Sequence, residues 1–222
     1  MSGLFISFEG GDGSGKSTQV QRLVAWLEAE GYSVVVTREP GGTELGGHIR
    51  HLLLHGGEVS PRAEALLYAA DRAHHMETKI LPALERGEIV ITDRFLDSSV
   101  AYQGAARSLD KQEVRDLSLW AVDGHMPAIT FLLDVPVEVG RERVGAEQDR
   151  LEAAGIEFHQ RVREEFCQLA QADPQRWHTI DATATIPAIE QEIRAVVQKR
   201  LATAHSIDLT RRVVEAPGSL DL

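Results

Sequence analysis

The sequence is poor in cysteine and in long apolar runs, and it lacks an excess of positive charge. Cys167 is its one cysteine, so no internal disulfide can form and nothing requires an oxidising compartment. No apolar stretch approaches the roughly 18 residues that cross a membrane, and residues 1–4 lack the basic start of a signal peptide. Lys and Arg number 23 against 34 Asp and Glu, and a net charge of −11 disfavours nucleic acid and anionic lipid. We therefore expect a cytoplasmic protein with no nucleic-acid and no membrane partner.

Short β-branched or aromatic segments alternate with longer segments of helical periodicity in this chain of 222 residues. The expected strands are 4–9, 33–37, 89–92, 129–134 and 179–181. The expected helices are 16–30, 43–55, 61–86, 111–122, 137–145, about 150–172, and 187–201. Strands joined through helices form a parallel sheet with helices on both faces. The prediction is one α/β domain over 1–201, a three-layer sandwich around a five-stranded parallel sheet. The tail, 202–222, has no sustained period, and we expect it to be mobile.

The most specific motif follows the first expected strand. Residues 10–17 read Gly-Gly-Asp-Gly-Ser-Gly-Lys-Ser and match G-x-x-x-x-G-K-[ST] at every fixed position, between a strand and a helix. Glycines let backbone N–H groups surround a phosphate, Lys16 adds a mobile positive charge, and Ser17 offers a hydroxyl to Mg²⁺. The motif predicts a nucleotide site. ATPases, GTP switches and small-molecule kinases all use such loops, and the lack of an Asn-Lys-x-Asp segment weakens the GTP-switch hypothesis.

Charged residues also follow the second and third expected strands. Asp93 and Arg94 end an apolar segment, at the strand end where open α/β sheets bind ligands. The aspartate could organise a metal and the arginine could clamp a phosphate, although the two would equally fit an ion pair that closes a strand. Arg38 holds a similar position after the second strand. We therefore expect both arginines at an anionic site.

Other candidates carry a weaker signal. Arg72, Arg141, Arg143 and Arg150 could converge on the same anion, although each alone fits a solvated surface charge. Tyr68 and Arg72 share one helix face, and a flat ring beside a planar donor fork suits a nucleobase. An ordinary buried tyrosine with a surface arginine one turn later would give the same spacing.

Several segments together resemble one family. They are Phe-Glu-Gly at 8–10, Thr-Arg-Glu-Pro-Gly-Gly-Thr at 37–43, Tyr-Ala-Ala-Asp-Arg at 68–72, Asp-Arg-Phe at 93–95 followed by Ser98 and Ala-Tyr-Gln-Gly at 101–104, Leu-Leu-Asp-Val at 132–135, and Asp-Arg-Leu-Glu at 149–152. From about 4 to 201 the chain resembles the bacterial thymidylate kinases, which are P-loop nucleoside monophosphate kinases. The Arg-Glu-Pro-Gly-Gly-Thr and Ala-Tyr-Gln segments are specific to that family.

The resemblance implies transfer of the γ-phosphoryl group of ATP to dTMP with Mg²⁺, in dTTP synthesis, by a homodimer. The loop that would hold the ATP phosphates comprises Gly10, Gly11, Asp12, Gly13, Ser14, Gly15, Lys16, Ser17 and Thr18. Arg38 and Arg94 would hold the dTMP phosphate, and Asp12 would meet the sugar 3′-hydroxyl. Tyr68 would stack on thymine, Arg72 would contact the base, and Tyr102 and Gln103 would complete the pocket. Ser17 and Asp93 would bind the metal ion. Lys16, Arg94 and Arg150 would be the catalytic residues.

The chain departs from the family pattern at two positions. Gly13 stands where some members carry an arginine, so the charge-stabilising arginine should come from a lid at about 141–155. Arg150 is the first choice for it, with Arg141 or Arg143 as substitutes near ATP. Tyr68 stands where phenylalanine is common, and its hydroxyl needs a partner. Two alternatives stay open: a kinase for another deoxynucleotide or a deoxynucleoside, and a nucleotide-dependent switch or partition ATPase.

Overall fold

The computed structural model describes residues 3–106, 109–144 and 154–215, with side chains in the last range as far as 203. The strands are β1 (Leu4–Glu9), β2 (Val34–Arg38), β3 (Ile89–Asp93), β4 (Ile129–Asp134) and β5 (Trp177–Asp181). The helices are α1 (Lys16–Ala29), α2 (Glu44–His55), α3 (Pro61–His75), α4 (Leu81–Glu85), α5 (Leu96–Ser99), α6 (Lys111–Ala121), α7 (Val137–Arg143), α8 (Ile156–Ala172) and α9 (Ile186–Glu215), with π-helical segments η1 (Met76–Ile80) and η2 (Val100–Ala105).

The five strands form one parallel sheet in the order β2-β3-β1-β4-β5, which confirms the predicted α/β architecture. The chain runs from β1 past β3 to β2, and later from β3 past β1 to β4. The connections that follow the neighbouring strands β1 and β3 therefore leave in opposite directions. Neighbouring strands whose connections diverge in this way open a crevice at their carboxyl ends, where α/β proteins bind ligands. The loops after β1, β2 and β3 therefore meet at one edge of the sheet.

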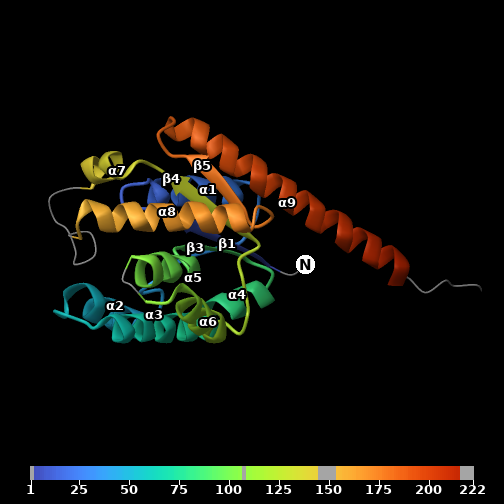
Figure 1. The fold of residues 1–222 in the computed structure, drawn as a ribbon. Coiled ribbons are helices and arrows are strands. Elements are labelled where there is room, and N and C mark those ends of the chain that lie inside the picture. The colour runs from blue at the N-terminus through green and yellow to red at the C-terminus, as the bar shows by residue number, and fades with distance from the viewer. Residues whose placement is uncertain (1–2, 107–108, 145–153, 216–222) are drawn as a thin grey trace, which may run out of the picture.

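Alternating side chains of each strand pack against different helices. Ile6 and Phe8 of β1 face α1 and α9, where Leu23 and Ile193 join the same core cluster. Phe5, on the opposite face, packs with η1, α4 and α5. A third cluster joins α8 to α2, α3 and η2. The sheet is thus covered on both faces (Figure 1), and none of the described helices is long and apolar enough to cross a membrane.

The expected helix 61–86 is divided in the structure. It consists of α3, the π-helical turn η1 and α4, and Pro82 lies in the first turn of α4. Proline has no N–H and clashes with the preceding turn, so a continuous α-helix cannot pass through it, whereas a widened turn accommodates it. The helical pair α5 and η2, at 96–105, was not expected from the periodicity of the sequence.

Two further boundaries differ from the prediction. Helix α8 begins at Ile156 rather than near 150, because Gly155 occupies the N-cap position. Helix α9 continues to Glu215 and extends beyond the sheet in Figure 1, so it is longer than the expected helix 187–201. Residues 188–216 contain neither proline nor glycine and are rich in strong helix formers, which sustain a helix without an apolar period. Residues 216–222 lie outside the described residues.

Candidate active site

The loop after β1 has the backbone that its glycines predict. Gly10, Gly13 and Gly15 all have positive φ, and Gly15 is the N-cap of α1. The ammonium group of Lys16 donates to the carbonyl oxygens of Gly10 at 3.1 Å and Gly11 at 3.0 Å. Burial, together with the charge of Arg94, lowers the pKa of Lys16. The ammonium group of Lys16 is therefore held inside the glycine-rich loop by the backbone of that loop.

Two glycines bring this loop into backbone contact with α7. A Cβ at Gly13 would lie 2.1 Å from the carbonyl oxygen of Gly140, and a Cβ at Gly140 would lie 2.6 Å from that of Asp12. Arg143, at the end of α7, donates to the carbonyl oxygens of Gly13 at 3.4 Å and Ala182 at 3.1 Å. An arginine at position 13 does not fit beside α7, which gives a steric reason for the glycine.

Arg94, Asp12 and Tyr102 form a connected group at the carboxyl ends of β1 and β3. The Arg94 guanidinium donates to Asp12 at 2.6 Å and to the Tyr102 hydroxyl at 3.1 Å, and the same hydroxyl donates to Asp12 at 3.3 Å. Burial opposes ionisation of Asp12, but Arg94 and Lys16 outweigh it and lower the pKa of this carboxyl. Asp12, Arg94 and Tyr102, three residues predicted to bind dTMP, are thus brought together from separate segments of the chain.

Arg72 is held by the protein at all of its guanidinium nitrogens. Its Nε donates to Glu39 at 2.7 Å, Nη1 to Ser118 at 3.3 Å, and Nη2 to Ser99 at 3.0 Å and the carbonyl of Phe95 at 3.4 Å. The side chain is 1% exposed. The hypothesis of a surface charge is therefore wrong for Arg72: its guanidinium is a fixed part of the cavity wall.

Buried acids and a histidine surround the loop after β2. His75 joins Glu39, at 3.0 Å, to the hydroxyl of Thr37, at 2.6 Å. Asp71 accepts the N–H of Gly41 at 3.3 Å, and its second oxygen is buried without a hydrogen-bond partner among the described residues. Burial, with a contribution from Glu39, raises the pKa of Asp71 to about 6. The Asp71 carboxyl therefore holds the loop after β2 by a hydrogen bond, and its protonation changes near pH 6.

The described residues fit a magnesium ion. Asp93 Oδ1 is buried and has no hydrogen-bond partner among them, and Asp93 and Ser17 line the same cavity. Mg²⁺ prefers oxygen ligands and usually takes few of them from the protein, with the others from water and phosphate. In the described ranges no group of three His, Cys, Asp or Glu side chains could form an all-protein metal site.

A cavity of about 740 Å³ joins these groups. The predicted residues that line it are Asp12, Gly13, Ser14, Gly15, Lys16, Ser17, Thr18, Arg38, Tyr68, Arg72, Asp93, Arg94, Tyr102, Gln103 and Arg143. Gly10 is buried and does not line this cavity, and Gly11 and Arg141 instead line a separate small pocket between the loop, α7 and α8. Arg150 lies outside the described residues. The cavity thus has a loop side and an arginine-rich side.

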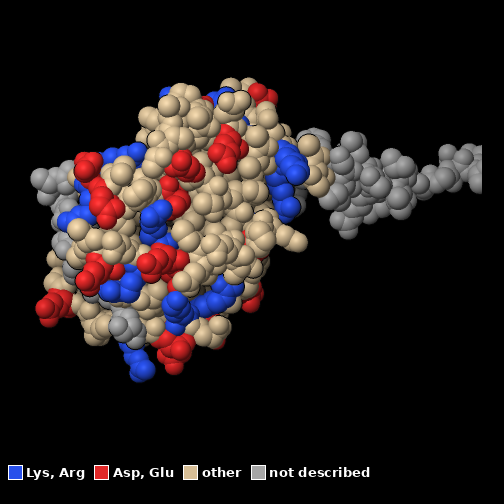
Figure 2. Space-filling view, turned by 45° about the horizontal axis from the view of Figure 1, so that its top comes forward, with Lys and Arg blue, Asp and Glu red and all other residues tan. Residues whose placement is uncertain are grey.

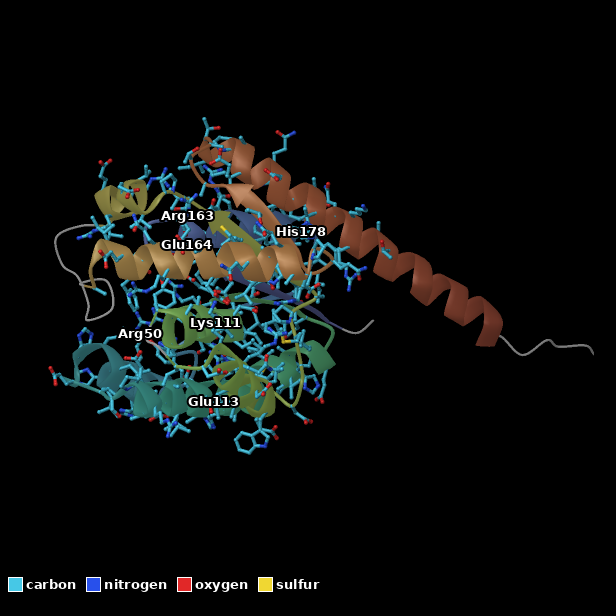
Figure 3. All side chains as sticks on the ribbon, in the orientation of Figure 1. Arg50, Lys111, Glu113, Arg163, Glu164 and His178 are labelled. Atoms are coloured by element: carbon cyan, nitrogen blue, oxygen red, sulfur yellow. The ribbon has the colours of Figure 1, made fainter. Side chains whose placement is uncertain are left out.

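Sequence reasoning missed several residues of the cavity wall. Arg50 of α2 lines it and donates to the carbonyl of Pro40 at 3.2 Å (Figure 3). No motif marked this arginine, which lies two turns into a helix. Ala182, Ala184 and Ile186 also line the cavity. They follow β5, so the rule that ligands bind at carboxyl strand ends would have found them.

The parallel sheet, the glycine-rich loop and the arginine-lined cavity beside it define a P-loop α/β protein. The thymidylate kinase family model matches residues 8–193. The chain is 57% identical to the thymidylate kinase of Clavibacter sepedonicus, over 88% of this chain and 94% of the relative, and 54% identical to that of Bifidobacterium longum subsp. infantis, over 90% and 88%. A crystal structure of the Ehrlichia chaffeensis thymidylate kinase superimposes with a TM-score of 0.73 at 36% identity, covering 89% of this chain and 99% of that chain. The chain belongs to the thymidylate kinase family.

The close contact between the loop and α7 predicts a difference between two glycine variants. Gly140→Ala should lower the free energy of unfolding by about 1–3 kcal/mol, because the added methyl group meets the backbone of Asp12. Gly47→Ala, at a helical position with open space around it, should raise the free energy by about 0.5–1 kcal/mol. Denaturant unfolding of both variants measures this. Equal effects of the two substitutions would show that the backbone contact carries no constraint.

Asp71 predicts a pH-dependent stability difference. Because its pKa is 3.8 ordinarily and about 6 in the folded chain, the folded state retains a proton between pH 4 and 6 that the unfolded state releases. The contribution of Asp71 to stability therefore falls over that interval and is constant above it. Asp71→Asn does not titrate, so its stability relative to wild type should rise by about 2–3 kcal/mol from pH 4 to pH 7, at about 1.4 kcal/mol per pKa unit. A difference in unfolding free energy between Asp71→Asn and wild type that stays the same at all pH values would contradict the raised pKa.

Proposed function

We propose that this chain transfers the γ-phosphoryl group of ATP to dTMP, forming ADP and dTDP. The observation that carries the proposal is the single cavity of about 740 Å³ that has the phosphate loop on one side and Arg38, Arg94, Tyr68 and Arg72 on the other. Membership of the thymidylate kinase family supports the choice of dTMP as acceptor. We assign 1–201 to one kinase domain on the same grounds.

ATP is assigned to the loop side of the cavity. The backbone N–H groups of residues 10–18 and the start of α1 would face the β- and γ-phosphates, and Lys16 would exchange its contacts with the loop carbonyls for phosphate oxygens. Arg143 lines this side, whereas Arg141 does not. We therefore favour Arg143 as the described lid residue nearest to ATP, with Arg150 as the further arginine that the resemblance implies.

dTMP is assigned to the opposite side. Its phosphate would lie between Arg38 and Arg94, and Asp12, which Arg94 already holds at 2.6 Å, would accept the sugar 3′-hydroxyl. Tyr68 offers a ring for thymine to stack on, and the fixed guanidinium of Arg72 faces the base. Arg50 adds positive charge to this side. Gln103 donates to the buried Glu64 at 3.0 Å, so its role would be to shape the wall.

The reaction needs charge neutralisation and alignment more than covalent chemistry. An oxygen of the dTMP phosphate attacks the γ-phosphorus, the bond to the ADP oxygen breaks, and both phosphates are already ionised, so no general base is required. Lys16, Arg94 and an arginine of the lid would offset the repulsion between the two anions. Ser17 and Asp93 would hold Mg²⁺, which when bound neutralises phosphate charge. Exclusion of water from the closed cavity would limit ATP hydrolysis.

We also propose a cytoplasmic homodimer without a nucleic-acid or membrane partner. The net charge of −11 and the mixed acidic and basic side chains on the face in Figure 2 support the exclusion of polyanions. Large apolar side chains are exposed on neighbouring helices: Leu52 of α2, Leu66 of α3 and Trp120 of α6, which is 80% exposed. These helices lie together on one side of the molecule in Figure 1, and a second copy would cover them.

An acceptor panel tests the function. Purified protein with ATP and Mg²⁺ is supplied with dTMP, dUMP, dCMP, dGMP or thymidine, and ADP release and product identity are measured. We expect the highest kcat/KM with dTMP and a value about five-fold lower with dUMP, since burial of one methyl group contributes about 1 kcal/mol. ADP release without acceptor should be slow. Rapid release without acceptor would indicate an ATPase, and a better acceptor than dTMP would reject the assignment.

If α3 lies in the dimer interface, a charged residue introduced on its exposed face should dissociate the dimer into monomers. Leu66 is 57% exposed, and Leu66→Asp should shift the sedimentation coefficient of the protein to that of a monomer. Ile156→Asp is the matched control, because Ile156 is 45% exposed and belongs to α8 rather than to α2, α3 or α6. A Leu66→Asp protein that still sediments as a dimer would place the interface elsewhere.

A further inference from the structure

We propose that Glu9 is a positioning residue that aims Arg94 at the acceptor phosphate. The inference rests on the proposed function, in which Arg94 holds that phosphate. Glu9 ends β1, is fully buried and does not line the cavity, so it cannot act on a ligand directly. Its carboxylate instead reaches Arg94 by two routes, one through the backbone and one through a side chain.

The backbone route fixes an unusual conformation. Arg94 has a φ of 68°, in the left-handed region that residues other than glycine rarely adopt. The N–H of Arg94 donates to the carbonyl of Phe8 at 2.9 Å, and the next N–H, that of Phe95, donates to Glu9 Oε1 at 2.8 Å. Consecutive residues of β1 therefore hold the peptide groups on both sides of Arg94. A conformation of this kind persists where its surroundings determine it.

The side-chain route runs through Ser98. Arg94 Nη1 donates to Ser98 Oγ at 3.2 Å, and the Ser98 hydroxyl donates to Glu9 Oε2 at 2.6 Å. The hydroxyl accepts from the cation and donates to the carboxylate, so the chain of hydrogen bonds has a defined direction. One buried carboxylate thus supports both the backbone turn and the guanidinium plane of Arg94, together with the carbonyl of Gly10, which also accepts from Nη1 at 3.1 Å. The other guanidinium nitrogen keeps its contacts with Asp12 and Tyr102.

Glu9→Gln breaks this arrangement with little change of volume. The amide oxygen can still accept the N–H of Phe95, but the amide nitrogen is a donor and faces a hydroxyl that already receives Arg94. Glu165→Gln is the matched control. Glu165 is also buried, at 6% exposure, and pairs with Lys111, the first residue of α6 (Figure 3). Neither residue lines the cavity.

The experiment measures steady-state kinetics and calorimetric dTMP affinity of each variant, after wild type is shown to convert dTMP. Failure of wild type to do so would reject the proposed function. If wild type is active, we expect Glu9→Gln to reduce dTMP affinity and kcat/KM for dTMP by about 10- to 100-fold, with the KM for ATP within about twofold. Glu165→Gln should match wild type. In an Arg94→Ala background, Glu9→Gln should change dTMP affinity less than about twofold, because its route to the ligand is gone.

Two results would overturn the proposal. One is a folded Glu9→Gln protein with wild-type affinity and rate; the other is a parallel rise of both KM values, which would mean a general loss of the site. If Glu9→Gln does not fold, Ser98→Ala decides, because it removes the side-chain route alone. A reduced dTMP affinity in Ser98→Ala that vanishes in the Arg94→Ala background supports the proposal, and an unchanged affinity contradicts it.

Discussion

Buried positive charge at the carboxyl edge of the sheet is the constraint on which the rest of this structure depends. Lys16 is buried and Arg94 is partly buried in a chain whose net charge is −11. Burying cations is costly unless carboxylates or other acceptors surround them, and Asp12, Asp93 and Glu9 all lie within electrostatic range of both. The strand ends supply these acids from β1 and β3, so the order of the strands and the charge balance of the site are two aspects of one arrangement.

The protonation of an acid in this site does not follow from the sign of its nearest charged neighbour alone. Burial, and after it Asp97, raises the pKa of Glu9, whereas Ser98, Arg94 and the N–H of Phe95 act in the opposite direction. Asp97 in turn forms a two-point ion pair with Arg176 at 2.7 and 3.1 Å. The network therefore continues from Glu9 at the end of β1 to Arg176, the residue before β5.

Much of this fold and site could be predicted from the sequence, because local rules and the period of apolar residues specify them. Strands 4–9 and 129–134 agree with the structure at both ends, and the glycine-rich loop stands where its motif requires. Other features depend on tertiary contacts that no local pattern encodes. The environment of Arg72 requires Glu39, Ser99 and Ser118 from three separate segments. Likewise, the contact of Gly13 with Gly140 joins residues that are far apart in the chain.

The anchoring of Arg72 has a consequence for the thermodynamics of recognition. A long side chain that is free in solution loses about 1.5–2 kcal/mol of rotamer entropy when a ligand immobilises it. Here the fold has already restricted that side chain, since Glu39, Ser118 and Ser99 hold it from separate directions. Under the proposed function, a base that docked against it would meet a rigid donor rather than a flexible one. Affinity at this wall would then respond to small changes in ligand shape, since the arginine has no freedom to follow them.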